Sequence, residues 1–453
     1  MQFHQPQKEQ SLAMLKELIE QNREFDIIDL FSKLHHADVA GLIDNLEEQE
    51  KRRLFALLDV EMASDVILEL SDHSREQILS DISDERLADM VEEMDTDDAA
   101  DFVADLPKDQ AKAVLEDIHP DDSEDIRELL EYDEDTAGGI MQSELIAVPQ
   151  KATINDALHA VVEASQEIDR TYNVYVVDEK NRLLGAVPLQ NLITSKRHDP
   201  IMGAIDTSLP SVNPEMDQEE VARIFRKYDL VSVPVVDREG HLIGRITVDD
   251  IVDVFEEESS EDLYRIAGLD EDDHVFNSPW ESIKKRLPWL YINLLTAFVS
   301  VFVIGFFEDT LKTMVTLALF MPVVAGLGGN AGGQTLALIV RGLALGEITM
   351  HNARRALLRQ ILVGIANGAA VGVVVGFIAY LLKGSSLLGI VLGLAMIINV
   401  FVGTLMGTLV PLALKILKLD PALGSNIFIT AFTDAFGFLS FLGLATIFLK
   451  MLA

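Results

Sequence analysis

Long apolar runs are confined to the last third of the chain and predict membrane-spanning helices. Most of these runs reach the about 20 apolar residues that a helix needs to cross about 30 Å of hydrocarbon. Glycine recurs at every fourth position in them, for example from Gly364 to Gly376, which lets helix backbones approach closely in lipid. Core helices of a soluble protein are the alternative, but five such runs argue against it. The predicted spans are residues 287–307, 311–327, 361–382, 387–414 and 427–449.

The second predicted span carries a glycine-rich interruption. Pro322 is followed by the stretch 326–334, which includes the amides Asn330 and Gln334. This composition predicts a broken backbone. Such a break is tolerated at membrane depth only where it packs in protein or lines a wet cavity. A structural bend is one interpretation, and the two amide side chains favour a cavity wall.

The first part of the chain, to about residue 132, follows a period of twelve. An apolar residue recurs at each step, and polar residues that typically begin helices, such as Ser71-Asp72 and Ser83-Asp84, follow it closely. Short helix-turn units of this kind are expected to stack into an all-α superhelix, each burying its apolar face on its neighbours. The recurring residues are Leu34, Leu46, Leu58, Leu70, Ile82, Met94, Leu106, Ile118 and Leu130.

The next part, about residues 138–258, reads as two copies of one strand-and-helix pattern. Each copy has an amphipathic helix followed by two apolar strands, and Asp178 and Asp237 occupy the same place in the two copies, 59 residues apart. The α/β repeat resembles a tandem pair of cystathionine-β-synthase (CBS) domains, a regulatory module. The predicted helices are residues 154–163 and 217–227, and the predicted strands are 174–178, 184–187, 233–237 and 243–247.

The second copy carries a candidate nucleotide contact. Thr247 and Asp250, in the sequence Gly244-x-x-Thr-x-x-Asp, resemble the adenosine-ribose contact of CBS modules. ATP is therefore a candidate ligand of the CBS pair. A purely structural Thr–Asp pair is the alternative.

An acidic segment, residues 249–278, connects this part to the first span. Val252, Phe255, Leu263 and Ile266 form a helix-like apolar stripe under a dense acidic face. Such a face is often only a solvated surface. Crowded carboxylates repel one another, however, by about 1 kcal/mol per pair at 4 Å in water and more near a protein surface. A segment of this kind is expected to respond to divalent cations.

Charge divides the chain at the same place as hydropathy. From residue 287 to the end there are five acidic and nine basic residues, whereas the first 286 residues hold 69 acidic and 27 basic ones. The net charge of −38 argues against nucleic acid as a partner. Cysteine is absent, which excludes disulfides and thiol chemistry. No catalytic constellation is recognised, so we do not expect an enzyme.

Basic residues predict the orientation of the spans. They gather at 284–286, 354–359 and 415–418, and only Lys312, Lys383 and Lys450 fall on the opposite side. Because positive loops stay inside, the acidic domains are expected in the cytoplasm and, with five spans, the C-terminus outside.

One carboxylate, Asp434, falls within the predicted spans. A charge at bilayer depth is costly and by default marks an ion or proton path. Asn426, Thr430 and Asp434 recur at intervals of four and form one oxygen-bearing stripe on the last helix. Hard oxygen ligands suit Mg²⁺ or Ca²⁺, and a symmetric dimer would bring two such carboxylates together. A hydrogen bond or salt bridge between helices is the alternative.

The chain resembles the MgtE magnesium channel/transporter family along nearly its whole length. The order of parts is the same, and the most specific motifs are Gly328-Gly-Asn-Ala-Gly-Gly-Gln334, Asp420-Pro-Ala-Leu and Thr433-Asp434-x-x-Gly437. The resemblance implies a homodimer in the inner (plasma) membrane, whose pore binds hydrated Mg²⁺ at Asp434, with Asn426 and Thr430 lining it.

The resemblance also implies that cytoplasmic Mg²⁺ regulates the pore. At high internal Mg²⁺ the ions would bridge acidic faces and hold the pore closed. The N-domain register leaves Asp98 or Asp105 as alternatives. The implied regulatory ligands are Asp65, Asp97, Asp101, Asp217, Glu219, Asp229, Asp250, Asp253, Glu258, Glu261 and Asp262.

These patterns together predict a multidomain chain. Two other functions stay open: a proton-coupled cation transporter with Asp434 as proton relay, and a membrane-anchored nucleotide sensor. The sensor is disfavoured because a plain anchor needs neither Asp434 nor a broken span. The predicted parts are a tail (1–23), a helical N-domain (24–137), two CBS domains (138–200 and 201–252), a connecting "plug" helix (253–280) and a transmembrane pore domain (281–453).

Overall fold

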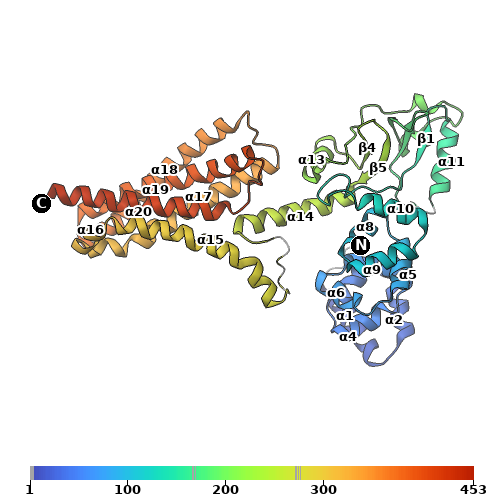
Figure 1. The fold of residues 1–453 in the computed structure, drawn as a ribbon, viewed down its shortest axis with the longest axis horizontal. Coiled ribbons are helices and arrows are strands. Elements are labelled where there is room, and N and C mark those ends of the chain that lie inside the picture. Colours follow the sequence, from blue (N-terminus) through green and yellow to red (C-terminus); the bar gives the residue numbers. More distant parts are fainter. Residues whose placement is uncertain are drawn as a thin grey trace. The chain divides into compact units, whose positions relative to one another are not determined.

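The computed structural model describes residues 5–165, 168, 170–270, 273, 275 and 277–452 (Figure 1). It divides into two compact units, Met1–Phe255 and Glu256–Ala453. The first unit contains a helical N-domain and a CBS pair, and the second contains the apolar helices. The predicted fold class is therefore confirmed. The first four residues of the predicted tail and four positions of the connecting segment (271, 272, 274 and 276) lie outside the described residues.

The N-domain is a stack of short helices whose starts follow the twelve-residue period. Each helix from α3 to α10 begins twelve residues after the one before it, and a recurring apolar residue stands two positions ahead of that start. An apolar residue in this place packs at the entry to the helix, and most of the nine are buried. The helices are α2 (Glu24–Phe31), α3 (His36–Ile43), α4 (Glu48–Phe55), α5 (Val60–Glu69), α6 (Asp72–Leu79), α7 (Asp84–Glu92), α8 (Thr96–Asp105), α9 (Lys108–Asp117) and α10 (Pro120–Leu129).

The predicted tail is largely a helix, which corrects that prediction. Helix α1 (Gln5–Glu20) places Leu15 and Leu18 in the N-domain core. Leu15 is completely buried. Each later helix packs mainly on the next but one, for example α3 on α5 and α5 on α7, so the stack has two layers.

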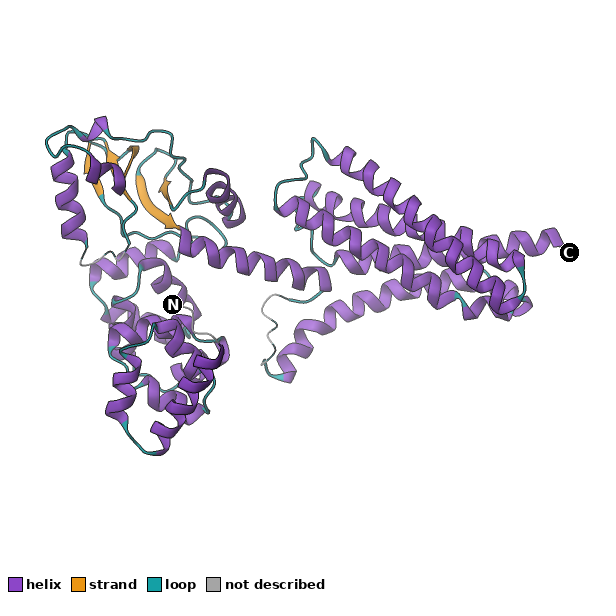
Figure 2. Ribbon diagram, turned by 180° about the vertical axis from the view of Figure 1, so that it is seen from behind, coloured by secondary structure: helices purple, strands orange, loops and turns teal. Residues whose placement is uncertain are grey.

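The CBS part has the two predicted copies. In the first, strand β1 (Ala147–Pro149) pairs in parallel with β2 (Asn173–Val177), which pairs antiparallel with β3 (Leu183–Pro188). In the second, β4 (Ser232–Val236) pairs antiparallel with β5 (Leu242–Thr247). Figure 2 shows these strands in orange among the purple helices. The helices of this part are α11 (Ile154–Ala164), α12 (Leu189–Thr194), the 3₁₀ turn η1 (Ile201–Gly203) and α13 (Gln218–Tyr228).

The second CBS copy shares its core with the N-domain. Phe225 and Val235 of the second copy belong to the same apolar cluster as Phe102 of α8 and Ile126 of α10. The first copy has a separate core around Val174 and Val187. The acidic N-domain is therefore packed against the second copy within the first unit.

Helix α14 (Val248–Ala267) overlaps the predicted connecting helix (253–280) but begins five residues and ends thirteen residues before the predicted bounds, and it runs unbroken across the division between the two units. The residues it buries differ from the predicted stripe. Ile251 and Val254 are buried, whereas Val252 and Leu263 are exposed by 60% and 69%. The core of the first unit determines which face of α14 is buried, because Ile251 and Val254 pack into that core.

Within its described residues, the second unit contains five helices long and apolar enough to cross a membrane, as predicted. Of the five, α19 is the most buried and α15 the least. Figure 1 shows α17, α18, α19 and α20 running side by side. The helices are α15 (Pro279–Gly305), α16 (Glu308–Thr313), the 3₁₀ turn η2 (Val315–Leu319), α17 (Met321–Ala344), α18 (Ala353–Lys383), α19 (Ser386–Ile416) and α20 (Ser425–Leu452).

The predicted break in the second span is in the wrong place. Helix α17 continues through the glycine-rich stretch, and the irregular backbone lies earlier, at Met314 and in η2. Pro322 stands in the first turn of α17, where its missing N–H is not needed. The glycines serve contact between helices instead: a Cβ on Gly407 of α19 would lie 2.5 Å from the carbonyl oxygen of Gly332.

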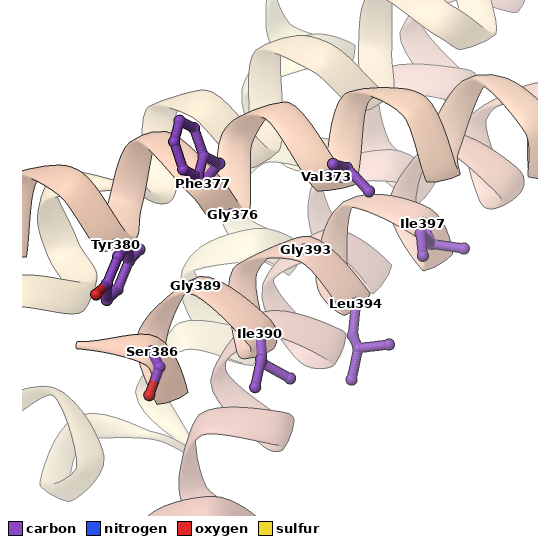
Figure 3. Close-up of a pocket in the computed structure, with 11 residues that line it drawn as sticks. Val373, Gly376, Phe377, Tyr380, Ser386, Gly389, Ile390, Gly393, Leu394 and Ile397 are labelled. Atoms are coloured by element: carbon purple, nitrogen blue, oxygen red, sulfur yellow. The ribbon is translucent and has the colours of Figure 1, made fainter. Parts of the chain in front are cut away.

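Glycine also sets the contact between α18 and α19. A Cβ on Gly376 would lie 2.5 Å from the carbonyl oxygen of Gly389, so the two backbones touch, as the four-residue glycine spacing predicted. Figure 3 shows the groove beside this contact, lined by apolar side chains such as Phe377 and Ile390. Tyr380 and Ser386 lie at one end of it.

Candidate functional site

The oxygen-bearing stripe of the last span lies on one face of α20. Asn426 is exposed in the single chain, and Thr430 and Asp434 are partly exposed. The neighbouring Thr433 is fully buried, and its hydroxyl donates to the Thr430 carbonyl oxygen at 3.0 Å. Asp434 is the only Asp or Glu in the sequences of α17 to α20. The stripe therefore offers a carboxylate, a hydroxyl and an amide in line along the helix.

Helix α17 adds polar groups beside this stripe. A Cβ on Gly333 of α17 would lie 3.6 Å from the Asn426 side-chain oxygen, so the two helices approach here without bulky side chains. Asn330 and Gln334 are both exposed and stand four residues apart on one face of α17. Together α17 and α20 present hard oxygen ligands along a face that the rest of this chain leaves uncovered. Oxygen ligands of this kind suit Mg²⁺ and Ca²⁺.

A second concentration of carboxylates lies in the first unit, where α8 meets the start of α14. Burial, and next the charge of Asp250, raise the pKa of Asp97 well above its usual value. Desolvation by the surrounding protein, and next the charges of Asp250, Asp95, Asp101 and Asp253, raise the pKa of Asp98 to about 7, although part of its side chain reaches solvent. We call these six residues the α8–α14 acid cluster. Their mutual repulsion is the property that a divalent cation would relieve.

Asp97 is the most confined member of this cluster. Its side chain is only 6% exposed, and its Oδ1 has no hydrogen-bond partner among the described residues. A buried carboxylate oxygen without a donor is costly. A cation would supply the missing partner.

Asp250 has two roles at once. Its Oδ2 accepts hydrogen bonds from the Thr247 backbone N–H at 3.0 Å and from the Thr247 hydroxyl at 2.9 Å, which caps the first turn of α14. Burial is nevertheless the largest influence and raises the pKa of Asp250 to about 6. The Thr247 hydroxyl also bonds Asp249. These bonds support the structural interpretation of the Thr–Asp pair, and both hydrogen bonds from Thr247 to Asp250 end on Oδ2.

Other predicted ligands have local partners. Asp65 bonds His36 Nδ1 at 3.0 Å, and Glu219 pairs with Arg223 at 2.6 Å. Asp217 caps the start of α13, while Asp229 ends it in the left-handed conformation. Among the alternatives, the structure places Asp98 in the cluster, whereas Asp105 pairs with Arg75 at 3.4 Å. Of the predicted sensor residues, the structure brings together Asp97, Asp101, Asp250 and Asp253.

Glu144 was not predicted from the sequence. Its Oε2 accepts from the Thr96 hydroxyl at 2.9 Å at the start of α8, and burial raises its pKa. It is one of 74 acidic residues and stands in no recognisable motif, so only the fold reveals its place beside the cluster.

The second half of α14 carries Glu258, Glu261 and Asp262 and belongs to the second unit. Here the sequence also failed to identify Arg265. Arg265 pairs with Glu261 and donates from Nη1 to Asp420 Oδ2 at 2.9 Å. Its carbonyl oxygen accepts from the Gly424 N–H at 3.0 Å. These bonds hold the end of α14 against the loop that precedes α20. Asn426 is the second residue of α20.

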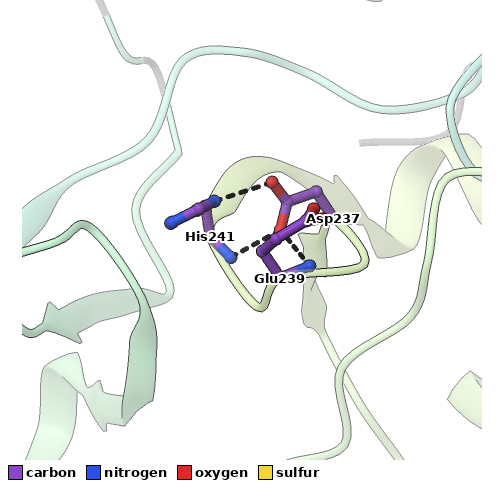
Figure 4. Close-up of side chains that lie close together, drawn as sticks. All are labelled: Asp237, Glu239 and His241. Atoms are coloured by element: carbon purple, nitrogen blue, oxygen red, sulfur yellow. Dashed lines mark hydrogen bonds and ion pairs between the residues drawn. The ribbon is translucent and has the colours of Figure 1, made fainter.

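A third group of possible ligands lies on the hairpin of the second CBS copy. The ligand atoms of Asp237, Glu239 and His241 lie within 4.8 Å of one another (Figure 4). Asp237 accepts from the His241 ring at 2.8 Å and from the backbone N–H groups of Glu239 and His241. In the first copy, Asp178 and Arg182 make the same bonds. Because both copies contain this arrangement, we interpret the group as a set of hydrogen bonds that closes the hairpin turn.

Comparison with known proteins agrees with this division of the chain. A family model described as "Divalent cation transporter" (MgtE) matches residues 321–444. The MgtE intracellular N domain matches residues 34–135, and CBS domains match 137–197 and 202–257.

Curated relatives match over most of the chain. A magnesium transporter MgtE of Enterococcus faecalis is 34% identical over 444 residues, 98% of each chain. That of Thermus thermophilus is 34% identical over 328 residues, 72% of this chain and 73% of the relative.

Two solved structures resemble the first unit. The soluble part of a magnesium transporter covers 56% of this chain and 99% of its own, with a TM-score of 0.52 and 31% identity. The cytosolic domain of the Mg²⁺ channel MgtE in complex with ATP covers 54% of this chain and 99% of its own, with a TM-score of 0.51 and 30% identity. The similarity extends over the helical N-domain, the CBS pair and the apolar helices alike, and this chain belongs to the MgtE family of divalent cation transporters.

Proposed function

We propose that two copies of this chain form a Mg²⁺-selective channel that mediates Mg²⁺ uptake and that cytoplasmic Mg²⁺ closes. The observation that carries the proposal is the stripe of Asn426, Thr430 and Asp434, uncovered in the single chain beside the polar face of α17. A carboxylate in a membrane helix is retained where it serves a path for ions or protons. The names of the relatives support Mg²⁺ as the cargo.

The homodimer follows from what one carboxylate can do. Mg²⁺ gives up its water reluctantly and is usually held by one or two carboxylates with several waters retained. A two-fold axis running along the uncovered stripe would bring two Asp434 side chains to one hydrated ion. It would also cover Asn330 and Gln334, which are exposed in the single chain.

The test is Mg²⁺ influx into proteoliposomes that contain a fluorescent Mg²⁺ indicator, without a pH gradient. We expect fast influx for the wild type and its loss, or loss of selectivity, in Asp434→Asn. Glu308→Gln is the matched control, because Glu308 pairs with Lys312 outside the stripe. Influx that requires a pH gradient would favour proton-coupled transport. Equal influx in Asp434→Asn and the wild type would remove Asp434 from the path.

We assign the gate to the acid cluster and to the α14 carboxylates. Mg²⁺ that binds Asp97, Asp101, Asp250 and Asp253 would relieve their repulsion and hold α14 against α8. The second half of α14 would transmit this state through Arg265 to the start of α20. Asp65, Asp217, Glu219 and Asp229 stay proposed as peripheral ligands, with Glu258, Glu261 and Asp262 on α14.

Patch recordings test the gate. In the triple variant Asp250→Asn, Asp253→Asn, Glu258→Gln, closure should depend less on cytoplasmic Mg²⁺, because a ligand shifts an equilibrium only by its differential affinity for the two states. An unchanged Mg²⁺ dose–response would contradict the gating scheme while leaving the pore proposal intact.

We further propose that the CBS pair binds ATP. A relative's cytosolic domain binds it, and Asp250 would offer Oδ1 to the ribose while Oδ2 caps α14. Calorimetric titration of the full chain with ATP tests this, and Thr247→Val should weaken binding. Absence of heat in the wild type would leave Thr247 and Asp250 with the capping role alone.

The predicted orientation has a direct test. Because the chain has no cysteine, single cysteines report without background. In intact cells an impermeant thiol reagent should label Lys383→Cys, in the α18–α19 turn, and should leave Leu417→Cys unlabelled. The reverse pattern would place the acidic domains and the C-terminus on the opposite sides from those proposed.

A further inference from the structure

Asn399 is a fully buried polar residue in the middle of α19, the most buried of the spans. Its Nδ2 donates to the Val324 carbonyl oxygen of α17 at 2.6 Å, and its Oδ1 has no partner among the described residues. The neighbours Met396 and Val400 belong to an apolar cluster. A polar group buried among apolar ones is costly, so its presence here points to a task that an apolar side chain would not perform.

The amide of Asn399 touches a third helix as well. A Cβ on Gly328 of α17 would lie 2.6 Å from Cγ of Asn399, and a Cβ on Gly437 of α20 would lie 2.9 Å from the same atom. One side chain therefore fills the space between the backbones of α17 and α20. Gly437 is less than one turn from Asp434, and Gly328 is two residues from Asn330.

We propose that Asn399 is a positioning residue that fixes the spacing of α17 and α20 and thereby the discrimination between Mg²⁺ and Ca²⁺ at Asp434. The inference rests on the proposed cation path along these helices. Mg²⁺ demands near-ideal octahedral geometry and short ligand distances, whereas Ca²⁺ accepts longer and less regular ones. A change in the spacing of the two helices should therefore penalise Mg²⁺ more than Ca²⁺.

The hydrogen bond gives Asn399 a function beyond filling space. Other buried polar groups of α19 bond within their own helix, as Thr404 does to the Val400 carbonyl oxygen at 2.9 Å. A bond that crosses to α17 adds to the packing of the two helices a resistance to sliding or rotation of α17 against α19 that these intrahelical bonds cannot supply. A residue that only packed would alter the amount of folded protein and all fluxes in proportion, not the ratio between two cations.

The test compares initial Mg²⁺ and Ca²⁺ influx in proteoliposomes for the wild type and Asn399→Leu, which keeps the branching and the number of side-chain heavy atoms and removes the bond. We expect the Mg²⁺:Ca²⁺ ratio to fall by about fivefold or more, since selectivity follows cavity size and ligand geometry. Thr404→Val is the control, because Thr404 faces Gly364 of α18, and its ratio should match the wild type. A proportional fall of both fluxes in Asn399→Leu would overturn the inference.

A second pair of variants tests the same contact if Asn399→Leu does not fold. Gly437→Ala should press on the Asn399 amide and lower the ratio, whereas Gly443→Ala, also on α20 but away from Asn399, should leave the ratio unchanged. A ratio that falls equally in both variants, or in neither, would overturn the inference. Absence of Mg²⁺ influx in the wild type would instead overturn the proposed function, and with it this assignment, so the two failures are distinguishable.

Discussion

The acid cluster and the α20 stripe use the same chemical group in opposite ways. The cluster gathers six carboxylates from α8, its N-cap and α14, and desolvation together with the neighbouring charges raises the pKa of Asp98 to about 7. The stripe has one carboxylate, Asp434, followed along the helix by a hydroxyl and an amide. Many confined charges bind a divalent ion tightly and hold it, whereas a single charge allows it to leave. In the proposed function the first arrangement senses Mg²⁺ and the second conducts it.

The largest expected effect comes from making the stripe resemble the cluster. Thr430→Asp places a second carboxylate one turn from Asp434. A unit negative charge added about 6 Å from the doubly charged ion contributes about 5 to 6 kcal/mol at an effective dielectric constant near 20, so Mg²⁺ should bind more tightly and Mg²⁺ flux should fall at least about tenfold. Flux assays on equal amounts of reconstituted protein measure this. Thr430→Asn is the neutral control, and wild-type flux in Thr430→Asp would break the comparison.

The next effect concerns the link between the two regions. Arg265→Gln removes the ion pair to Asp420, in which both side chains are about a quarter exposed. Losing about 1 kcal/mol of coupling should shift the Mg²⁺ concentration that closes the channel about fivefold upward, with open-channel current unchanged. Patch recordings at graded cytoplasmic Mg²⁺ give both quantities. A smaller open-channel current at an unmoved midpoint would place Arg265 in the path instead of the coupling.

A smaller effect is expected within the cluster. Asp97→Asn removes one of the repelling charges, so the Mg²⁺-free protein should become more stable by about 1 kcal/mol, or about 2–4 °C in Tm for a unit of this size. The stabilisation gained on adding Mg²⁺ should shrink. Thermal unfolding of the full chain in detergent measures the Mg²⁺-free Tm and the increase in Tm on adding Mg²⁺. Asp109→Asn, at an exposed position of α9, is the control. A lower Mg²⁺-free Tm combined with an undiminished Mg²⁺ effect would show that Asp97 is not part of a sensor.

The regular parts of this fold were predictable because their information is local. The twelve-residue period marks each N-domain helix start, and the 59-residue offset between Asp178 and Asp237 marks the two CBS copies, since each pattern records which positions one short element buries. Glycine-rich α17 was misjudged because its glycines serve contact with α19 and do not break the helix. Their role depends on a helix that comes later in the chain.

The candidate sites were predictable only in part, because local spacing can be read from the sequence and contacts between distant segments cannot. The stripe on α20 follows from a spacing of four within one helix. The cluster needs α8 and α14 to meet, and only the family resemblance suggested which acids would be brought together. Arg265 and Asp420, 155 residues apart, are joined by tertiary packing alone. The apolar face predicted for α14 was wrong for the same reason. The core of the first unit buries Ile251 and Val254 in place of Val252.

The smallest expected effect is a pH dependence of the packing of α8 against α14, which we expect for the acid cluster and not for the α20 stripe. The pKa of Asp98 is raised to about 7 and that of Asp250 to about 6, from an ordinary value of 3.8. Between about pH 4 and pH 7 the packed cluster therefore binds more protons than the separated helices do. Stability of the packed state is highest below this window and is lost as pH rises through it, the reverse of a salt-bridged carboxylate.

Protons and Mg²⁺ neutralise the same charges, so Mg²⁺ should displace protons from the cluster. At pH 6.5, saturating Mg²⁺ should release about one proton per chain, and at pH 8.5 almost none. Calorimetry in two buffers of different ionisation enthalpy counts the protons. Asp98→Asn with Asp250→Asn should abolish the release, whereas Asp434→Asn should leave it intact, because Asp434 lies on α20 and is not a member of the cluster. Release that disappears in Asp434→Asn would assign the sensing charge to the membrane helix and remove the distinction between the two regions.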